Sequence, residues 1–84
     1  MKIHEYKIRD VNAYKDVTII EPCNLYECTL KDNVFVGPFC EIQNGVVVNE
    51  NTRIQSHSFI CEKVTIGKKT KTFRKLYFFF EYFG

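Results

Sequence analysis

His57 is the residue of this sequence best suited to proton transfer, because the only other histidine, His4, lies near the N-terminus. An imidazole can remove a proton from an ammonium group near neutral pH. The surrounding segment IQSHSF offers no second titratable partner in sequence. Two interpretations stay open: a base or polar contact to a substrate, or a surface turn residue with local hydrogen bonds.

The four cysteines do not predict a metal site. Their spacings of 5, 12 and 21 residues contain no CxxC pair, which argues against a zinc cluster. The N-terminus has no apolar signal segment, so we expect a cytoplasmic protein with reduced thiols. A nucleophilic cysteine would need a nearby base, which the sequence does not supply. The cysteines are Cys23, Cys28, Cys40 and Cys61.

A repeat of six residues has to position these side chains. An aliphatic residue recurs at Leu30, Val36, Ile42, Val48, Ile54, Ile60 and Ile66, and four residues later comes Val34, Cys40, Val46, Thr52, Ser58, Val64 or Thr70, each small or β-branched. The position before that small site holds Asn33, Gly45, Asn51 and His57, which tolerate left-handed backbone. Toward the N-terminus the same phase puts Thr18 and Asn24 at the aliphatic site and Pro22 and Cys28 at the small site.

This pattern predicts an all-β solenoid. A helix is disfavoured because the apolar period is 6 rather than 3.6 and β-branched residues dominate. Hairpins are disfavoured because the one Asn-Gly pair, Asn44-Gly45, lies in phase with the other corners. Short strands bent every six residues can instead stack inward side chains from coil to coil. Cys28 and Cys40 then belong to the core as small apolar residues.

The last residues differ in character from the rest. Residues 68–84 carry five Lys/Arg against one Glu, and seven of the thirteen Phe/Tyr lie in the last twelve residues. Nucleic-acid binding and membrane surfaces both use basic and aromatic residues. Here the basic cluster precedes the aromatic one, with little interleaving. We therefore predict a cap on the last coil or an unselected tail, with no nucleic-acid partner, and no apolar run of the ~20 residues that a membrane span needs.

The hexad pattern resembles the bacterial hexapeptide-repeat acyltransferases. The strings EPCNLYECTLKDNVFVGPF and RIQSHSFICE look like the subgroup that N-acetylates amino sugars carried on nucleotides. The resemblance implies a left-handed parallel β-helix, here of about three coils with an atypical aromatic C-terminal tail. We expect a lead-in or cap over 1–17, hexapeptide repeats over 18–71 and a non-repeat tail over 72–84.

The resemblance also implies a function. It implies a homotrimer, acetyl-CoA as the donor, a nucleotide-linked amino sugar as the acceptor, and active sites in grooves between subunits. The catalytic candidate is His57, and the substrate-binding candidates are Asn33, Arg53 and Gln55. The competing interpretation is that asparagine supports the corner conformation and that arginine is solvated on an outer face. Phe35 and Phe59 occupy an outward site, where a trimer could bury them.

One departure from the family pattern bears on activity. After VTIG, relatives continue with further hexads, whereas this chain has KKTKTFRKLYFFFEYFG. The sequence therefore predicts a truncated member of the family, of the kind a frameshift or premature stop would give. The alternative to an active acetyltransferase is a non-catalytic β-helix remnant or interaction module that assembles with itself or with a full-length relative.

Overall fold

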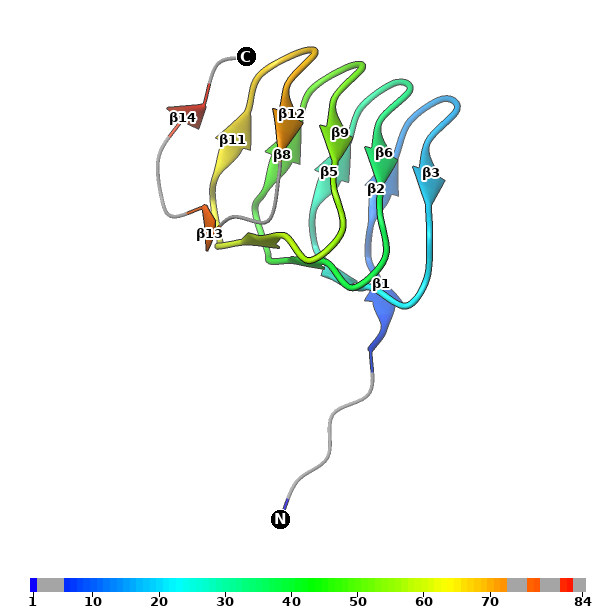
Figure 1. Ribbon diagram of the computed structural model, residues 1–84, viewed down its shortest axis with the longest axis vertical. Helices are drawn as coiled ribbons and strands as arrows, with labels where there is room; N and C mark the ends of the chain where they lie inside the picture. Colours follow the sequence, from blue (N-terminus) through cyan, green and yellow to red (C-terminus); the bar gives the residue numbers. More distant parts are fainter. Residues whose placement is uncertain (2–5, 73–75, 78–80, 83–84) are drawn as a thin grey trace.

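The computed structural model describes residues 1, 6–72, 76–77 and 81–82. The described part consists of short β-strands joined by tight corners and contains no helix (Figure 1), so the predicted all-β class is confirmed. In chain order the strands are β1 (Ile8–Arg9), β2 (Asn12–Ala13), β3 (Thr18–Ile19), β4 (Asn24–Tyr26), β5 (Thr29–Leu30), β6 (Phe35–Val36), β7 (Glu41–Ile42), β8 (Val47–Val48), β9 (Arg53–Ile54), β10 (Phe59–Ile60), β11 (Thr65–Ile66), β12 (Lys71–Thr72), β13 (Leu76–Tyr77) and β14 (Glu81–Tyr82).

The strands build three parallel sheets, one for each wall of a left-handed β-helix. Sheet A contains β1, β4, β7, β10 and β13; sheet B contains β2, β5, β8, β11 and β14; sheet C contains β3, β6, β9 and β12. Ile42 of β7 pairs with Leu25 of β4 on one side and with Ile60 of β10 on the other, so one coil takes 17 or 18 residues. The three coils from β4 to β12 enclose the buried interior, as the sequence predicts.

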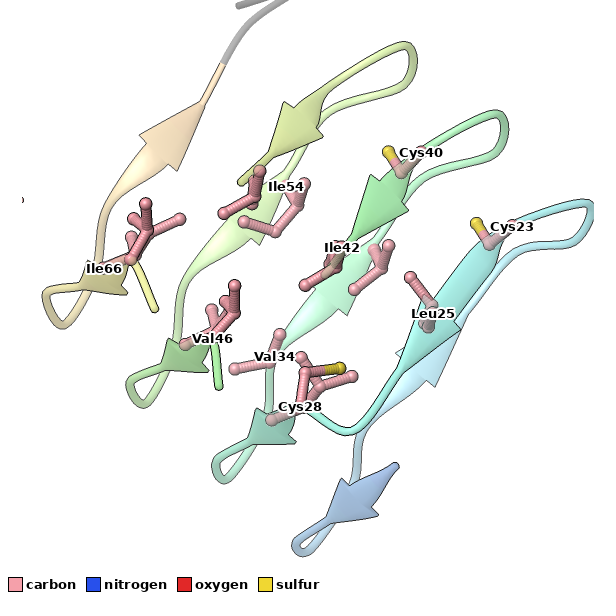
Figure 2. Packing of buried hydrophobic residues seen from close by; sticks show 14 residues of the cluster. Cys23, Leu25, Cys28, Val34, Cys40, Ile42, Val46, Ile54 and Ile66 are labelled. Carbon is pink, nitrogen blue, oxygen red and sulfur yellow. The ribbon is translucent and has the colours of Figure 1, made fainter. Parts of the chain in front are cut away.

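The core is made of columns of one aliphatic and one small side chain per hexad. All seven aliphatic positions from Leu30 to Ile66 have 0% of their surface exposed, which confirms the predicted phase. Figure 2 shows Leu25 and Ile42 at equivalent places in successive coils. Stacking like on like lets each coil bury the apolar side chains of the next, so a narrow solenoid gains a continuous core.

The predicted phase is wrong by one residue toward the N-terminus. Ile19 and Leu25 take the inward aliphatic positions, whereas Thr18 is exposed and Asn24 half-buried. The cause is a corner one residue shorter than the others: Leu25 and Leu30 are five residues apart, and both face inward. For the same reason Cys23, rather than Pro22, fills the small site, while Cys28 is buried as predicted. The full set of small-site cysteines is Cys23, Cys28 and Cys40.

Each corner turns on one residue with positive φ, and these residues form three columns. The predicted turn positions Asn33, Gly45, Asn51 and His57 all adopt this conformation. So do residues whose type does not announce it, which are Asp10, Asp16, Glu27, Phe39, Lys63 and Lys69. For non-glycine residues the left-handed region costs roughly 1–2 kcal/mol each, so the ladder of backbone hydrogen bonds between coils must hold these corners in place.

Polar residues at the small site satisfy corner carbonyl groups. The Thr52 hydroxyl donates to the Gly67 carbonyl at 2.7 Å, and the Ser58 hydroxyl donates to the Gln55 carbonyl at 2.8 Å. Within the part of the chain that the structure describes, no buried side-chain nitrogen or oxygen lacks a hydrogen-bond partner. These side chains therefore add no unpaired polar group to the core.

The ladders reach beyond both predicted segment boundaries. β1 pairs with β4 and β2 with β5, so the parallel sheets begin within 1–17. At the other end β13 pairs with β10 and β14 with β11, within 72–84. The side chains of 72–84 lie outside the described residues, and the division of the chain at 17/18 and 71/72 stays a prediction.

Candidate functional site

The predicted catalytic residue lies at the corner where sheet C passes into sheet A. We call residues 37–40, between β6 and β7, and residues 55–58, between β9 and β10, the third corner. A cleft of about 330 Å³ opens there. Its lining combines aromatic rings with a carboxylate, a thiol and a hydroxyl, contributed by Tyr6, Phe39, Cys40, Glu41, His57, Ser58 and Phe59.

The His57 imidazole is exposed and stacks on the ring of Phe39. The ring centroids are 5.2 Å apart and the planes are inclined by 22°. The two residues occupy the same position in successive coils, with φ of 63° and 59°. Their amides are anchored to the preceding coil, since the Phe39 N–H donates to the Pro22 carbonyl and the His57 N–H to the Pro38 carbonyl. A solvent-accessible imidazole is thus held beside a cleft.

The polar groups beside His57 belong to the two neighbouring strands of sheet A. The Glu41 N–H donates to the Ser58 carbonyl at 3.0 Å, which fixes β7 against β10 at the cleft. The Glu41 carboxylate accepts a hydrogen bond of 3.1 Å from the Gln43 amide. Charge and hydrogen-bonding capacity therefore lie next to an otherwise aromatic surface, as in many small-molecule sites.

Sequence reasoning did not identify Tyr6, Phe39, Glu41 and Ser58 as members of this cleft. One signal for Phe39 was available: it lies 18 residues before His57, which places the two rings at the same corner of adjacent coils. Glu41 carries no such signal in the sequence, because an outward charged residue on a strand is common. Its place in the cleft follows only from the pairing of β7 with β10.

The predicted substrate-binding residues are distributed over different walls. Gln55 shares the third corner with His57, and Arg53 lies on the outer surface of β9, just before that corner. Asn33 lies at the corner between sheets B and C, where its amide donates to the side-chain oxygen of Asn51 at 2.8 Å. The structure therefore groups Gln55 with His57, and it gives Asn33 a partner in the neighbouring coil.

Arg53 also explains the state of an outward aromatic residue. Its guanidinium lies 4.3 Å from the ring centroid of Phe35, directly across the β6–β9 ladder. Phe35 is consequently half-buried within the chain. Such cation–π contacts contribute about 0.5–1 kcal/mol at exposed sites.

The buried cysteines are poor nucleophiles. Burial raises the pKa of the Cys28 thiol to about 11 and raises the pKa of Cys23 and Cys40 as well. The Cys40 thiol donates to the Gln55 carbonyl at 3.1 Å, so it serves the corner as a hydrogen-bond donor. Among the described residues no group of three or more His, Cys, Asp or Glu side chains could hold a metal ion.

Comparison with known proteins agrees with this architecture. Residues 27–62 match the family model described as bacterial transferase hexapeptide (six repeats). The chain belongs to the bacterial hexapeptide-repeat family. The match covers the coils whose columns and corners are described above.

Three curated relatives of this hexapeptide-repeat chain carry the same name, acyl-(acyl-carrier-protein)–UDP-N-acetylglucosamine O-acyltransferase. The protein from Bartonella quintana (strain Toulouse) is 40% identical over 58 residues, that from Brucella anthropi 38% and that from Brucella ovis 36%. Each alignment covers 67% of this chain and 21% of the relative. The chain therefore spans about a fifth of the length of these relatives.

Two further findings complete the comparison. No solved structure matches the hexapeptide-repeat chain significantly. Among the described residues there is no helix long and apolar enough to cross a membrane. The relatives support acyl transfer at the level of the family, and their shared name differs from the N-acetyltransferase subgroup that the strings of the sequence resemble.

Proposed function

We propose that this hexapeptide-repeat chain takes part in transfer of an acyl group from a thioester to the amino group of a nucleotide-linked sugar. The observation that carries the proposal is the third-corner cleft, where an exposed imidazole stands beside an aromatic wall. Membership in the family and relatives named for acyl transfer to UDP-N-acetylglucosamine support the same reaction class.

In the proposed reaction His57 removes a proton from the sugar ammonium. The free amine nitrogen then attacks the thioester carbonyl carbon, a C–N bond forms, the C–S bond breaks, and the leaving thiolate takes up a proton. An imidazole fits this role because it changes protonation state near neutral pH. Gln55, at the same corner, and Arg53, just before it, would bind the sugar and the diphosphate, and Asn33 would contact substrate only from another wall.

The donor is proposed as an acyl thioester on phosphopantetheine, which acetyl-CoA and acyl carrier protein share. The sequence pattern favours acetyl-CoA, whereas the names of the relatives favour acyl carrier protein. A homotrimer in the cytoplasm belongs to the same proposal, with the cleft facing a neighbouring subunit.

The direct test is thiol release by the purified chain. The chain is incubated with UDP- or dTDP-linked amino sugars and with either acetyl-CoA or an acyl-acyl-carrier protein. We expect release that depends on the sugar and is lost in His57→Asn, since asparagine tolerates the left-handed corner. Asn33→Asp, at another corner, is the matched control. No release above background with any donor would reject the proposal.

The length covered in the relatives favours a second candidate function. A chain matching 21% of each relative could act as a non-catalytic β-helix module that assembles with itself or with a longer relative. Sedimentation velocity or mass photometry tests this candidate. A chain found only as monomer or aggregate, alone and with a longer relative, would reject it.

A further inference from the structure

Phe39 is an unusual residue for the corner that it occupies. Bulky residues rarely adopt positive φ, because the side chain crowds the backbone. The other described corner residues with positive φ, apart from His57, are Asp, Glu, Asn, Gly and Lys. Phe39 is also 48% exposed, so its ring does not contribute to the core. Neither backbone preference nor burial therefore accounts for an aromatic ring at this position.

The contact that Phe39 does make is with the candidate base. Both residues hold nearly the same φ in adjacent coils, and both amides are tied to the coil before. Their side chains consequently leave the backbone in register, and the rings lie nearly parallel at 5.2 Å. Aromatic pairs at such separations contribute about 0.5–1.5 kcal/mol beyond area burial.

We propose that Phe39 is a positioning residue that fixes the plane of the His57 imidazole beside the cleft. This inference rests on the proposed function of His57 as the base. An exposed imidazole can otherwise rotate about its Cβ–Cγ bond with little resistance. Stacking covers a face of the ring but leaves the in-plane nitrogen lone pair accessible. Proton transfer therefore remains open while the orientation of the ring is restricted.

The informative variant is Phe39→Asn, because asparagine tolerates positive φ and the corner should fold without strain. Loss of the aromatic ring current should move the His57 imidazole protons downfield, toward those of a solvent-exposed histidine. In the transfer assay we expect kcat to fall roughly 10- to 100-fold with a smaller change in KM, as for a misplaced reactive group. Phe39→Tyr keeps the ring and should preserve both readouts.

Two comparisons separate positioning from a general loss of structure. Tyr14→Leu removes a ring that lies under Lys31 at another corner, and it should leave the His57 resonances and the rate unchanged. Phe39→Leu keeps an apolar side chain without a ring, and it should behave as Phe39→Asn does. His57→Asn assigns the imidazole resonances.

The outcomes distinguish the two proposals. Unchanged imidazole resonances in both Phe39→Asn and Phe39→Leu would overturn the positioning role, and so would an unchanged kcat. A native chain without any transfer would remove the proposed function, while the resonance shift would still decide whether Phe39 orients His57. A shift together with a fall in kcat that Phe39→Tyr avoids supports both.

Discussion

The hydroxyl of Thr52 donates a hydrogen bond of 2.7 Å to the carbonyl oxygen of Gly67 in the next coil. The same hydroxyl oxygen accepts a bond of 3.2 Å from the amide of Thr70. Thr52 is fully buried, so water cannot replace either bond. One side chain thus links two successive corners through groups that the parallel ladder leaves unpaired.

We expect Thr52→Val to lower the free energy of unfolding by about 1–3 kcal/mol, since it leaves a buried carbonyl and a buried amide short of a partner at nearly constant volume. Urea unfolding followed by far-UV circular dichroism measures the change. Thr65→Val, at a half-buried position on the outer face of β11, is the matched control and should change stability by less than about 0.5 kcal/mol. Equal effects of the two substitutions would contradict this account.

The hexad phase predicted the walls and the interior because one physical requirement repeats at every coil. Leu30 through Ile66 are spaced by six residues, and every member of that series is fully buried. The prediction failed at Thr18 and Asn24, where one residue is missing from a corner. A deletion of this kind shifts the side chains between wall and core, and a fixed period cannot detect it. Leu25, five residues before Leu30, was the available signal.

The candidate site was predictable only in part. His57 was identifiable from its type alone, and its corner from the phase of the repeat. The cleft also depends on which strands lie beside each other, as with Glu41 and Phe59, which pair across the β7–β10 ladder. That neighbourhood follows from the number of residues in each coil. An error of one residue in the count therefore removes a side chain from the site while leaving the fold correct.

Gly37 and Gly45 should respond differently to substitution. A Cβ at Gly37 would lie 2.9 Å from the backbone nitrogen of Ser56, so Gly37→Ala should cost about 1–3 kcal/mol through overpacking. Gly45 has φ of 75°, and a Cβ there would meet the flexible Lys63 side chain at 3.2 Å. Gly45→Asn should therefore cost less than Gly37→Ala. Thermal unfolding of the two variants tests the order, and a reversed order would contradict it.

The Cys28 thiol should make stability depend on alkaline pH. Its pKa is raised from 9.0 to about 11, chiefly by burial, so the folded protein keeps the proton after the unfolded chain has lost it. The contribution is complete below about pH 9 and decreases as pH rises toward about 11. Urea unfolding at several pH values between 7 and 11 measures the decrease.

Cys28→Val separates this contribution from that of other groups. Valine fills the equivalent small site at Val46 and Val64, so the substitution should be nearly neutral at pH 7. It should reduce the loss of stability between pH 9 and pH 11. A decrease as steep as that of the unmodified chain would show that the Cys28 thiol is not its source.

Arg53 and Phe35 should be energetically coupled. The guanidinium lies 4.3 Å from the ring centroid, and the two residues are direct neighbours across the β6–β9 ladder. A double-mutant cycle with Arg53→Ala and Phe35→Leu should give a coupling of about 0.5–1 kcal/mol in the free energy of unfolding. Arg53→Lys keeps the charge but lacks the planar group, and we expect it to retain only part of the coupling. If Arg53 also binds a diphosphate, Arg53→Ala should raise KM for the nucleotide sugar, whereas Phe35→Leu should change stability with little effect on KM. A coupling near zero would mean that the stacked geometry adds nothing to the fold and that Arg53 is available to a ligand without loss of stability.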